Sequence, residues 1–394
     1  MKRFLRGLIL ISIFTLVGCS MKKSGNVLEK LEKKLKNADS YYVEGTMEIM
    51  NNEDTYTYDV KVAYQKKDYY RIELVNKLNN HEQVILRNNE GVYVVTPSLN
   101  KSFKFQSDWP YNNSQVYLIN SILEDLLEDE EREFKTKGDG YYYGSKVHYP
   151  NNKSLVKQKV YIDKDANITK AEVVDKDDNV QIVMDFNKIE YNKKFDKNYF
   201  ELSEMLKINT KNNSNSRNDN SENTNSKNET TTEETKNQEN SVNENNNNTN
   251  IENNNSSDNS NANSNSNDTD NTEGTNSKPT ATINDIIYPM YLPSNTYLTS
   301  QETVDTKDGQ RLILTFGGDS SFVLVEETVN IAEEGLVIPV NGEFDFLTDV
   351  IGVIGTNSLS WHSSGIDYYM ASDSITTAEL VDIARSISVL PVSK

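Results

Sequence analysis

The sequence has little of what catalytic, metal and disulfide sites need. Cys19 is the only cysteine in 394 residues, so no intrachain disulfide can form. The three histidines, His81, His148 and His362, are far apart, and none lies in an HxxxH or HExxH spacing. Zinc would therefore lack both histidine and cysteine ligands, and we expect each histidine on the surface of a loop or strand.

Positive charge is also scarce. The chain has 41 Lys and Arg against 60 Asp and Glu, a net charge of −19, which makes nucleic acid an implausible partner. No GxSxG elbow occurs, and the glycine-rich stretch 138–144 leads into a predicted strand and not into a phosphate-binding helix. Asp163–Asn167 and Asp175–Asn179 imitate calcium loops but lack the sixth-position glycine, so they indicate hairpin turns. We expect no enzyme, metal or cofactor.

The first nineteen residues resemble a targeting segment. Lys2, Arg3 and Arg6 precede an apolar run at 7–17, which is too short to span a bilayer comfortably. Leu16-Val17-Gly18-Cys19 then resembles the lipobox of bacterial lipoproteins. Residues 1–19 are thus predicted to be a lipoprotein signal peptide, with Cys19 as the lipidated residue. Acyl chains on Cys19 would hold the chain on the outer face of the cytoplasmic membrane.

Residues 209–278 cannot form a hydrophobic core. They contain 27 asparagines and no aromatic residue, and beyond Ala262 their only aliphatic side chains are Val242 and Ile251. Burial cannot offset a backbone ordering cost of about 1 to 2 kcal/mol per residue. This stretch is predicted to be an Asn-rich disordered linker. It carries 12 acidic and 5 basic residues, and so contributes −7 of the net charge.

The first folded region is predicted over residues 26–205. Val27, Leu28 and Leu31 lie at helical spacing after Ser24, a plausible N-cap. Alternating strands separated by turn signals follow, and a second helix is predicted from Ser114 to about Asp129. The simplest packing is one strongly curved antiparallel sheet of about ten strands, with both helices against one face. The predicted strands are 41–49, 56–65, 69–74, 83–88, 91–96, 102–106, 141–149, 156–163, 168–175 and 180–191.

A second folded region is predicted over residues 283–392 and is a small α+β unit. Arg311–Gly317 and Ser321–Glu327 alternate and are joined by a Gly-Gly-Asp turn. A further hairpin is predicted from 355–361 and 366–371. Thr376 and Glu379 form a capping box before a last amphipathic helix.

The sequence resembles a known family. The stretch from Gln83 to Pro110, which includes Gly91-Val-Tyr-Val-Val-Thr-Pro97 and ends in Trp109-Pro110, is similar to the YdcC-type sporulation lipoproteins of Gram-positive bacteria. These belong with the LolA and RseB group and with the germination lipoprotein GerS. The resemblance covers both folded regions and skips the Asn-rich stretch. It continues at 195–200, 288–293, 359–361 and 380–387.

The resemblance implies a LolA-like open half-barrel with covering helices and a concave, largely apolar face. Two functions remain open. The first is a non-enzymatic lipoprotein that binds a lipid, an acyl chain or a protein during sporulation or envelope maintenance. The second is a scaffold or allosteric partner of a cell-wall hydrolase, such as a spore-cortex amidase. An apolar pocket in the half-barrel would favour the first function, and a filled half-barrel with an exposed apolar patch would favour the second.

Two sets of residues are candidates for binding. Phe103, Phe105 and Trp109 are hypothesised to line the concave face, with plain core packing as the alternative. The acidic run Glu128, Asp129, Glu130 and Glu131 at the end of the second helix is hypothesised to contact a basic partner, with a solvated acidic face as the alternative.

Overall fold

The computed structural model describes residues 26–51, 54–207, 282–283, 285–347 and 349–387. The predicted signal peptide with Cys19, the proposed N-cap Ser24 and the predicted linker 209–278 therefore lie outside the described residues.

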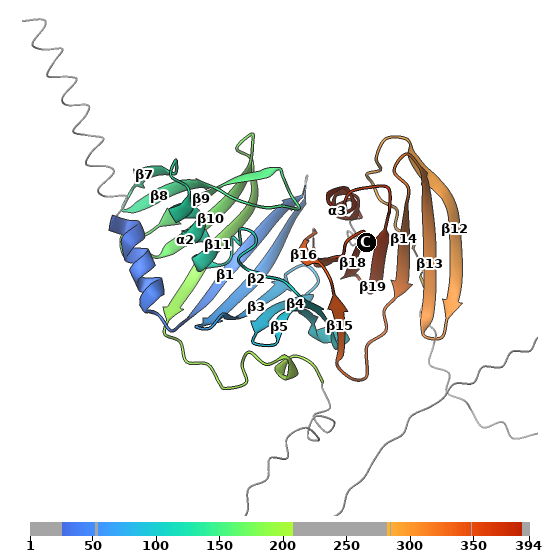
Figure 1. The fold of residues 1–394 in the computed structure, drawn as a ribbon, viewed down its shortest axis with the longest axis horizontal. Helices are drawn as coiled ribbons and strands as arrows, with labels where there is room; N and C mark the ends of the chain where they lie inside the picture. Colours follow the sequence, from blue (N-terminus) through green and yellow to red (C-terminus); the bar gives the residue numbers. More distant parts are fainter. Residues whose placement is uncertain (1–25, 52–53, 208–281, 284, 348, 388–394) are drawn as a thin grey trace, which may run out of the picture. The chain divides into compact units, whose positions relative to one another are not determined.

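Twelve strands form one open sheet, which Figure 1 shows to be strongly curved. Its two edge strands are not paired with each other, so the barrel does not close. All neighbouring strands pair antiparallel except β15 (Leu336–Val340) and β6 (Lys101–Phe105), which are parallel. The predicted open, curved antiparallel half-barrel is confirmed. In spatial order the strands are β15 (Leu336–Val340), β6 (Lys101–Phe105), β5 (Gly91–Thr96), β4 (Glu82–Asn88), β3 (Tyr69–Asn76), β2 (Asp54–Gln65), β1 (Ser40–Asn51), β11 (Val180–Tyr191), β10 (Ile168–Asp175), β9 (Leu155–Ile162), β8 (Gly140–Lys146) and β7 (Glu133–Lys137).

Ten of these strands were predicted from the sequence, and two were not. In β3, every second residue from Tyr70 to Asn76 is buried, as expected for a strand with one face on the core. β7 escaped prediction because Phe134 is its only apolar residue, so it lacks the alternation that marks a strand. β15 was not predicted because it is only five residues long and contains Pro339, which argues against a strand.

Two helices cover the concave face of this sheet. The first spans residues 26–37 and buries Val27, Leu28 and Leu31 in the same core cluster as the strands. The second is α2 (Ile119–Glu128), with Ile122 and Leu126 fully buried. Its apolar residues share one side, which explains why it packs flat against the sheet.

The predicted start of α2 at Ser114 is wrong by five residues. The Ser114 hydroxyl accepts a hydrogen bond from the backbone N–H of His148 and donates one to Asp125. The Ser121 hydroxyl accepts from the backbone N–H of Gln115. These bonds hold residues 114–118 in an irregular segment ahead of the helix.

Seven strands form a second antiparallel sheet, with α3 (Thr377–Arg385) against one face. The Thr376 hydroxyl accepts from the backbone N–H of Glu379 at 3.3 Å, as the capping prediction requires. Gly318 adopts a φ of 108° at the predicted turn. In spatial order the strands are β12 (Thr296–Thr306), β13 (Gly309–Gly318), β14 (Phe322–Thr328), β19 (Ile366–Ala371), β18 (Ser358–Ser363), β17 (Ile351–Ile354) and β16 (Glu343–Phe346).

The segment after β11 covers the outer face of β4 and β5. Phe200 packs there against Val84 and Tyr93 in a small separate cluster, and the Asn88 side chain donates to the Phe200 carbonyl at 3.0 Å. The chain up to residue 207 is therefore fixed on the outside of the half-barrel. Two short 3₁₀ helices complete the described structure: η1 (Pro97–Leu99) and η2 (Leu202–Glu204).

Candidate functional site

The three predicted cavity residues lie on the concave side of the half-barrel. Phe105 and Trp109 are each 2% exposed, and Phe103 is partly buried against the same core cluster. Phe105 and Trp109 do not face an open cavity. Their rings contact the ring of Phe344, with centroid distances of 5.3 Å and 5.9 Å.

The hairpin β16–β17 fills the concave face. Phe344, Ile351 and Val353 belong to the core cluster of the half-barrel, and Phe346 packs against it, edge-on to Tyr58. We call residues 343–347 and 349–354 the plug. It inserts from the second sheet, and β15 just before it pairs with β6 at the edge of the first sheet.

Polar contacts fix the plug in register with the half-barrel. The Gln83 side chain accepts from the Ile351 backbone N–H at 2.6 Å and donates to its carbonyl at 3.3 Å. The Asn76 amide donates to the Asp349 carbonyl. Because these are bonds to backbone atoms, they fix the position of the chain itself, whatever side chains it carries.

The space left beside the plug is small. A cavity of about 30 Å³ lies next to Phe344 and Phe346, room for roughly one water molecule. At the mouth, a cavity of about 250 Å³ is lined by Leu155, Leu347 and Arg385 among others. Ligand pockets typically measure roughly 300 to 1,000 Å³. Among the described residues, the plug fills most of the concave face of the half-barrel.

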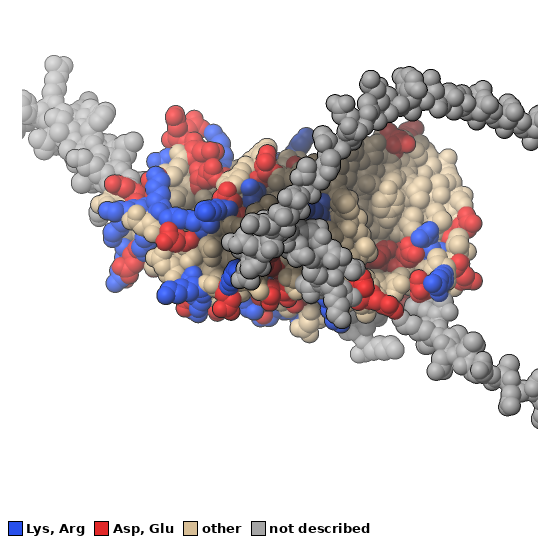
Figure 2. Space-filling view, turned by 60° about the horizontal axis from the view of Figure 1, so that its bottom comes forward, with Lys and Arg blue, Asp and Glu red and all other residues tan. Residues whose placement is uncertain are grey.

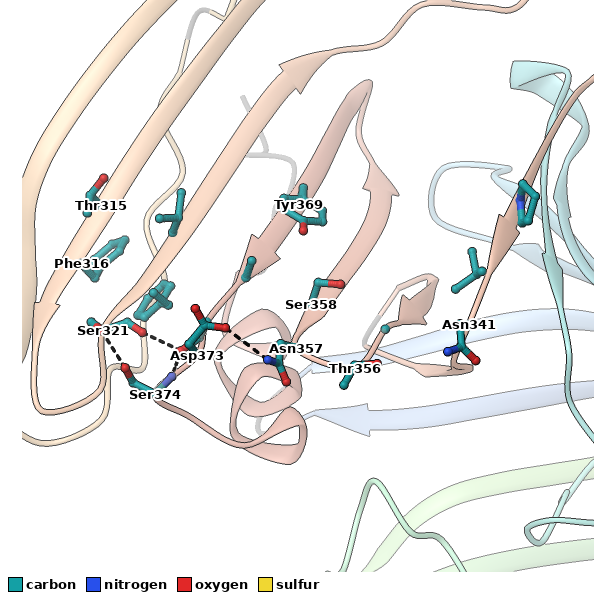
Figure 3. A pocket seen from close by; sticks show the side chains of 17 residues that line it. Thr315, Phe316, Ser321, Asn341, Thr356, Asn357, Ser358, Tyr369, Asp373 and Ser374 are labelled. Carbon is teal, nitrogen blue, oxygen red and sulfur yellow. Dashed lines mark hydrogen bonds between the residues drawn. The ribbon is translucent and has the colours of Figure 1, made fainter. Parts of the chain in front are cut away.

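A larger hollow opens on the second sheet, on the face that α3 does not cover (Figure 3). This trough has a volume of about 890 Å³. Thr315, Val323, Ala371 and Ser358 stand side by side across four strands and form its floor. Its other wall is the end of β15, at Pro339–Asn341.

The trough offers shape and hydrogen bonding, with very little charge. Its floor side chains are short, and Asp373 is the only Asp, Glu, Lys, Arg or His that lines it. The Asn357 amide donates to the Asp373 carboxylate at 3.2 Å, and the Ser372 hydroxyl donates to the Ser321 carbonyl. None of these groups pairs a nucleophile with a base. The geometry suits an extended, uncharged segment.

The expectation for the histidines holds for one of the three. His148 is exposed, but His81 and His362 are partly buried and lie with ring centroids 5.4 Å apart. His362 also pairs with Asp367 at 3.1 Å. Burial, with a smaller effect of His362, lowers the pKa of His81 to about 4. Sequence distance hid this pair because the two residues come from different sheets.

Three carboxylates have raised pKa values that the sequence did not indicate: Glu326 is fully buried, and Asp125 and Asp345 are partly buried. Burial raises the pKa of Asp125 to about 7, although Ser114 donates to it. Burial also raises the pKa of Glu326 to about 7, although the Ile287 N–H donates to it at 3.3 Å. Burial raises the pKa of Asp345, and Arg385 at 3.7 Å opposes the shift. Each of these carboxylates lies where two structural elements meet. Its ionisation therefore makes the stability of that contact depend on pH.

The acidic run lies where α2 ends. Glu128, Glu130 and Glu131 are exposed, whereas Asp129 caps the end of the helix and its carboxylate accepts from the Lys146 and Glu131 backbone N–H groups. Lys146 pairs with Glu131 at 2.7 Å. Part of this charge therefore stabilises the turn into β7, and the exposed remainder stays a candidate contact for a basic partner.

Within the described ranges, no three His, Cys, Asp or Glu side chains are grouped so that they could hold a metal ion. No helix in the same ranges is long and apolar enough to cross a membrane.

Two sequence comparisons find relatives. Residues 1–200 match the family model described as sporulation protein YdcC-like. The chain is also 31% identical to the sporulation protein YdcC of Bacillus subtilis over 379 residues, covering 96% of this chain and 94% of that protein.

The solved structures that resemble this chain have lower sequence identity to it than that relative does. The MucA/MucB complex of Pseudomonas aeruginosa includes a chain that is 10% identical, with coverage of 92% of this chain and 97% of that chain and a TM-score of 0.30. A chain of the Clostridioides difficile CwlD amidase complex with the GerS lipoprotein is 18% identical, with coverage of 44% and 94% and a TM-score of 0.23. A LolA superfamily protein of Nitrosomonas europaea is 12% identical, with coverage of 46% and 98% and a TM-score of 0.28. No ligand is transferred from likenesses this distant.

Proposed function

Because the chain belongs to the family of YdcC-like sporulation proteins, we propose that it is a non-enzymatic, lipid-anchored envelope protein that binds a protein partner during sporulation. Cys19 is its anchor, and the outer face of the cytoplasmic membrane is its location. The partner is a cell-wall hydrolase such as a spore-cortex amidase, for which the protein acts as a scaffold or allosteric activator.

The observation that carries this proposal is the contact of Phe344 with Phe105 and Trp109. It fills the concave face that would otherwise shield an acyl chain. Binding a lipid there would require the plug to leave, with loss of its bonds to Gln83 and Asn76. The trough requires no such rearrangement, because it is already open. A protein segment in the trough is therefore favoured over an acyl chain in the half-barrel.

The test is a binding measurement with the full chain in mild detergent and the host's purified cortex amidase as the probe. Ala371→Trp places a large ring on the trough floor, and we expect it to weaken binding by at least about tenfold. Thr169→Trp adds the same ring at an exposed position on β10, outside the trough, and should leave binding unchanged. Equal binding by wild type and Ala371→Trp would remove the trough from the proposal.

The acyl-binding alternative is tested on the same protein. Native mass spectrometry of the full chain purified from its host should detect no lipid beyond the anchor on Cys19. A stoichiometric second lipid, lost when Phe344 is replaced by Trp, would place an acyl chain in the half-barrel and overturn the scaffold proposal.

A further inference from the structure

β12 is a long, exposed strand at the edge of the second sheet (Figure 1). It has eleven residues, and nine of them are exposed. It pairs with β13 on one side, and within the described residues no strand pairs with its other side. A free strand edge presents unpaired backbone N–H and C=O groups that can bind another strand.

The other edge strands of the two sheets are protected. β7 places Glu133, Lys135 and Lys137 in five residues, β15 carries Pro339, and β16 has only four residues. Charge, proline and shortness each oppose pairing with a further strand. β12 contains no proline, is the longest of the four edge strands, and carries charge only at Glu302 and Asp305. Figure 2 shows a broad stretch of surface without charged side chains over the second sheet. Of the described edges, β12 is the one suited to pairing.

The register with β13 shows which backbone groups of β12 point outward. Thr306 pairs with Gly309 across a two-residue turn, and such a turn is closed by a mutually hydrogen-bonded pair. Bonded and non-bonded residues alternate in an antiparallel pair, so Val304 and Glu302 also bond to β13. Gln301, Thr303 and Asp305 then direct their N–H and C=O groups away from the sheet. A bulge beside Leu298 limits this regular edge to residues 300–306.

We propose that two copies of this chain pair antiparallel through β12, about a two-fold axis at Thr303. In that register Thr303 faces Thr303 of the second copy, and Gln301 faces Asp305 of the second copy. All three outward-bonding residues then find partners, with about six backbone hydrogen bonds across the axis. The two seven-stranded sheets become one continuous sheet.

The side chains fit this register. The side-chain oxygen of Gln301, Oε1, accepts a hydrogen bond from the Tyr288 hydroxyl at 2.8 Å. The side-chain amide N–H groups of Gln301 are therefore left for Asp305 of the second copy. Asp305 accepts from Gln310 through one oxygen, so its other oxygen can receive them. Threonine opposite threonine is a favourable cross-strand pair. Glu302 faces Val304 of the second copy, so no two like charges stand directly opposite each other.

Net charge opposes the association and makes it depend on salt. Residues 282–387 contain 16 Asp and Glu and 3 Lys and Arg, a net charge of −13. Two such regions repel each other at low ionic strength, and salt screens the repulsion. Dimerisation should therefore strengthen as the NaCl concentration rises.

Cross-linking tests the register. In a full-length Cys19→Ser background, Thr303→Cys introduces one cysteine at the axis, where facing Cα atoms of a bonded pair lie about 5.5 Å apart, within disulfide range. Mild oxidation should give a disulfide-linked dimer. Lys307→Cys, in the turn that follows the strand, is the control: the register separates the two copies of residue 307 widely, so it should stay monomeric. Equal cross-linking by both variants would overturn the register.

Sedimentation velocity of the full chain in mild detergent tests the association itself. Thr303→Pro removes an outward N–H without removing a bond to β13, and it should weaken dimerisation by at least about tenfold. Thr303→Val keeps the N–H and should dimerise like wild type. Near-ultraviolet circular dichroism checks that both variants keep the native fold. A wild type that stays monomeric at submillimolar concentration and high salt, or a folded Thr303→Pro variant that dimerises normally, would overturn the proposal.

Discussion

Phe344 contacts Phe105 edge-on, with ring centroids 5.3 Å apart, and so joins the two sheets through the concave face of the half-barrel. Phe105 belongs to the sixth strand of the chain, and Phe344 comes from beyond the Asn-rich stretch. Because of this contact, the second folded region contributes to the stability of the first.

Phe344→Ala should lower the free energy of unfolding by about 2 to 4 kcal/mol, because it removes a buried ring from between Phe105 and Trp109. Urea denaturation followed by tryptophan fluorescence measures the loss. Tyr297→Ala is the control: that side chain is 60% exposed, so its removal should cost less than about 0.5 kcal/mol. Equal losses for both variants would mean that the plug does not stabilise the half-barrel.

His81→Gln should flatten the dependence of stability on pH between about 4 and 6.5. The pKa of His81 falls to about 4 in the folded protein, so between these values the unfolded chain binds a proton that the folded chain does not. The contribution of neutral His81 to stability is therefore complete above pH 6.5 and falls by about 1 to 3 kcal/mol as the pH drops to 4.

The comparison for His81 is urea denaturation at closely spaced pH values. Asp349, which opposes the pKa shift of His81, and His362 with its partner Asp367 are unchanged in the variant, so their contributions cancel in the difference. A difference between wild type and variant that stays constant across this window would contradict the prediction.

Glu326→Gln should remove a contribution to stability whose pH dependence is opposite to that of His81. Burial raises the pKa of Glu326 to about 7, so the unfolded chain loses its proton first as the pH rises from about 4.5. The contribution of Glu326 is complete below that value and is lost as the pH rises through 7. The glutamine can still accept from the Ile287 N–H but never ionises.

At pH 8.5 the Glu326→Gln variant should therefore be more stable than wild type by about 1 to 3 kcal/mol, and at pH 4.5 the two should be equal. Thermal unfolding across this range measures the difference. Glu327→Gln, at the neighbouring partly exposed position paired with Arg311, is the control and should not gain stability at high pH. A gain for both variants would point to net charge as the cause.

Much of the half-barrel could be predicted from the sequence, because its strands bury one face and therefore alternate, and because Gln83 to Pro110 resembles a family to which the chain does belong. The filling of its concave face could not. Glu343–Phe346 is four residues long, too short to show the alternation of apolar and polar residues that predicts a strand. Its packing partner lies in another sheet, and no local pattern encodes that contact. For the same reason, Phe105 and Trp109 could be assigned to the interior but not to a contact with Phe344.

The trough and the histidine pair escaped prediction for a related reason. The trough floor is built from Thr315, Val323, Ala371 and Ser358, small residues whose sequence positions carry no signal of binding. Only the cross-strand register brings them together, and register depends on the complete sheet. His81 and His362 likewise meet only when β3–β4 and β18 are placed together.

Replacing the proposed anchor residue, Cys19→Ala, should abolish lipidation of the protein. In the proposed lipoprotein, Cys19 is the only thiol that can be acylated, and two or more acyl chains at about 0.8 kcal/mol per buried methylene hold the protein firmly. Cells grown with an alkyne-tagged fatty acid should label the wild type, while Cys19→Ala should carry no label. Ser20→Ala, the neighbouring position, should label normally and controls for export. Persistent labelling of Cys19→Ala would show that acylation occurs through another residue, and it would separate the lipobox from the membrane attachment that the proposed function requires.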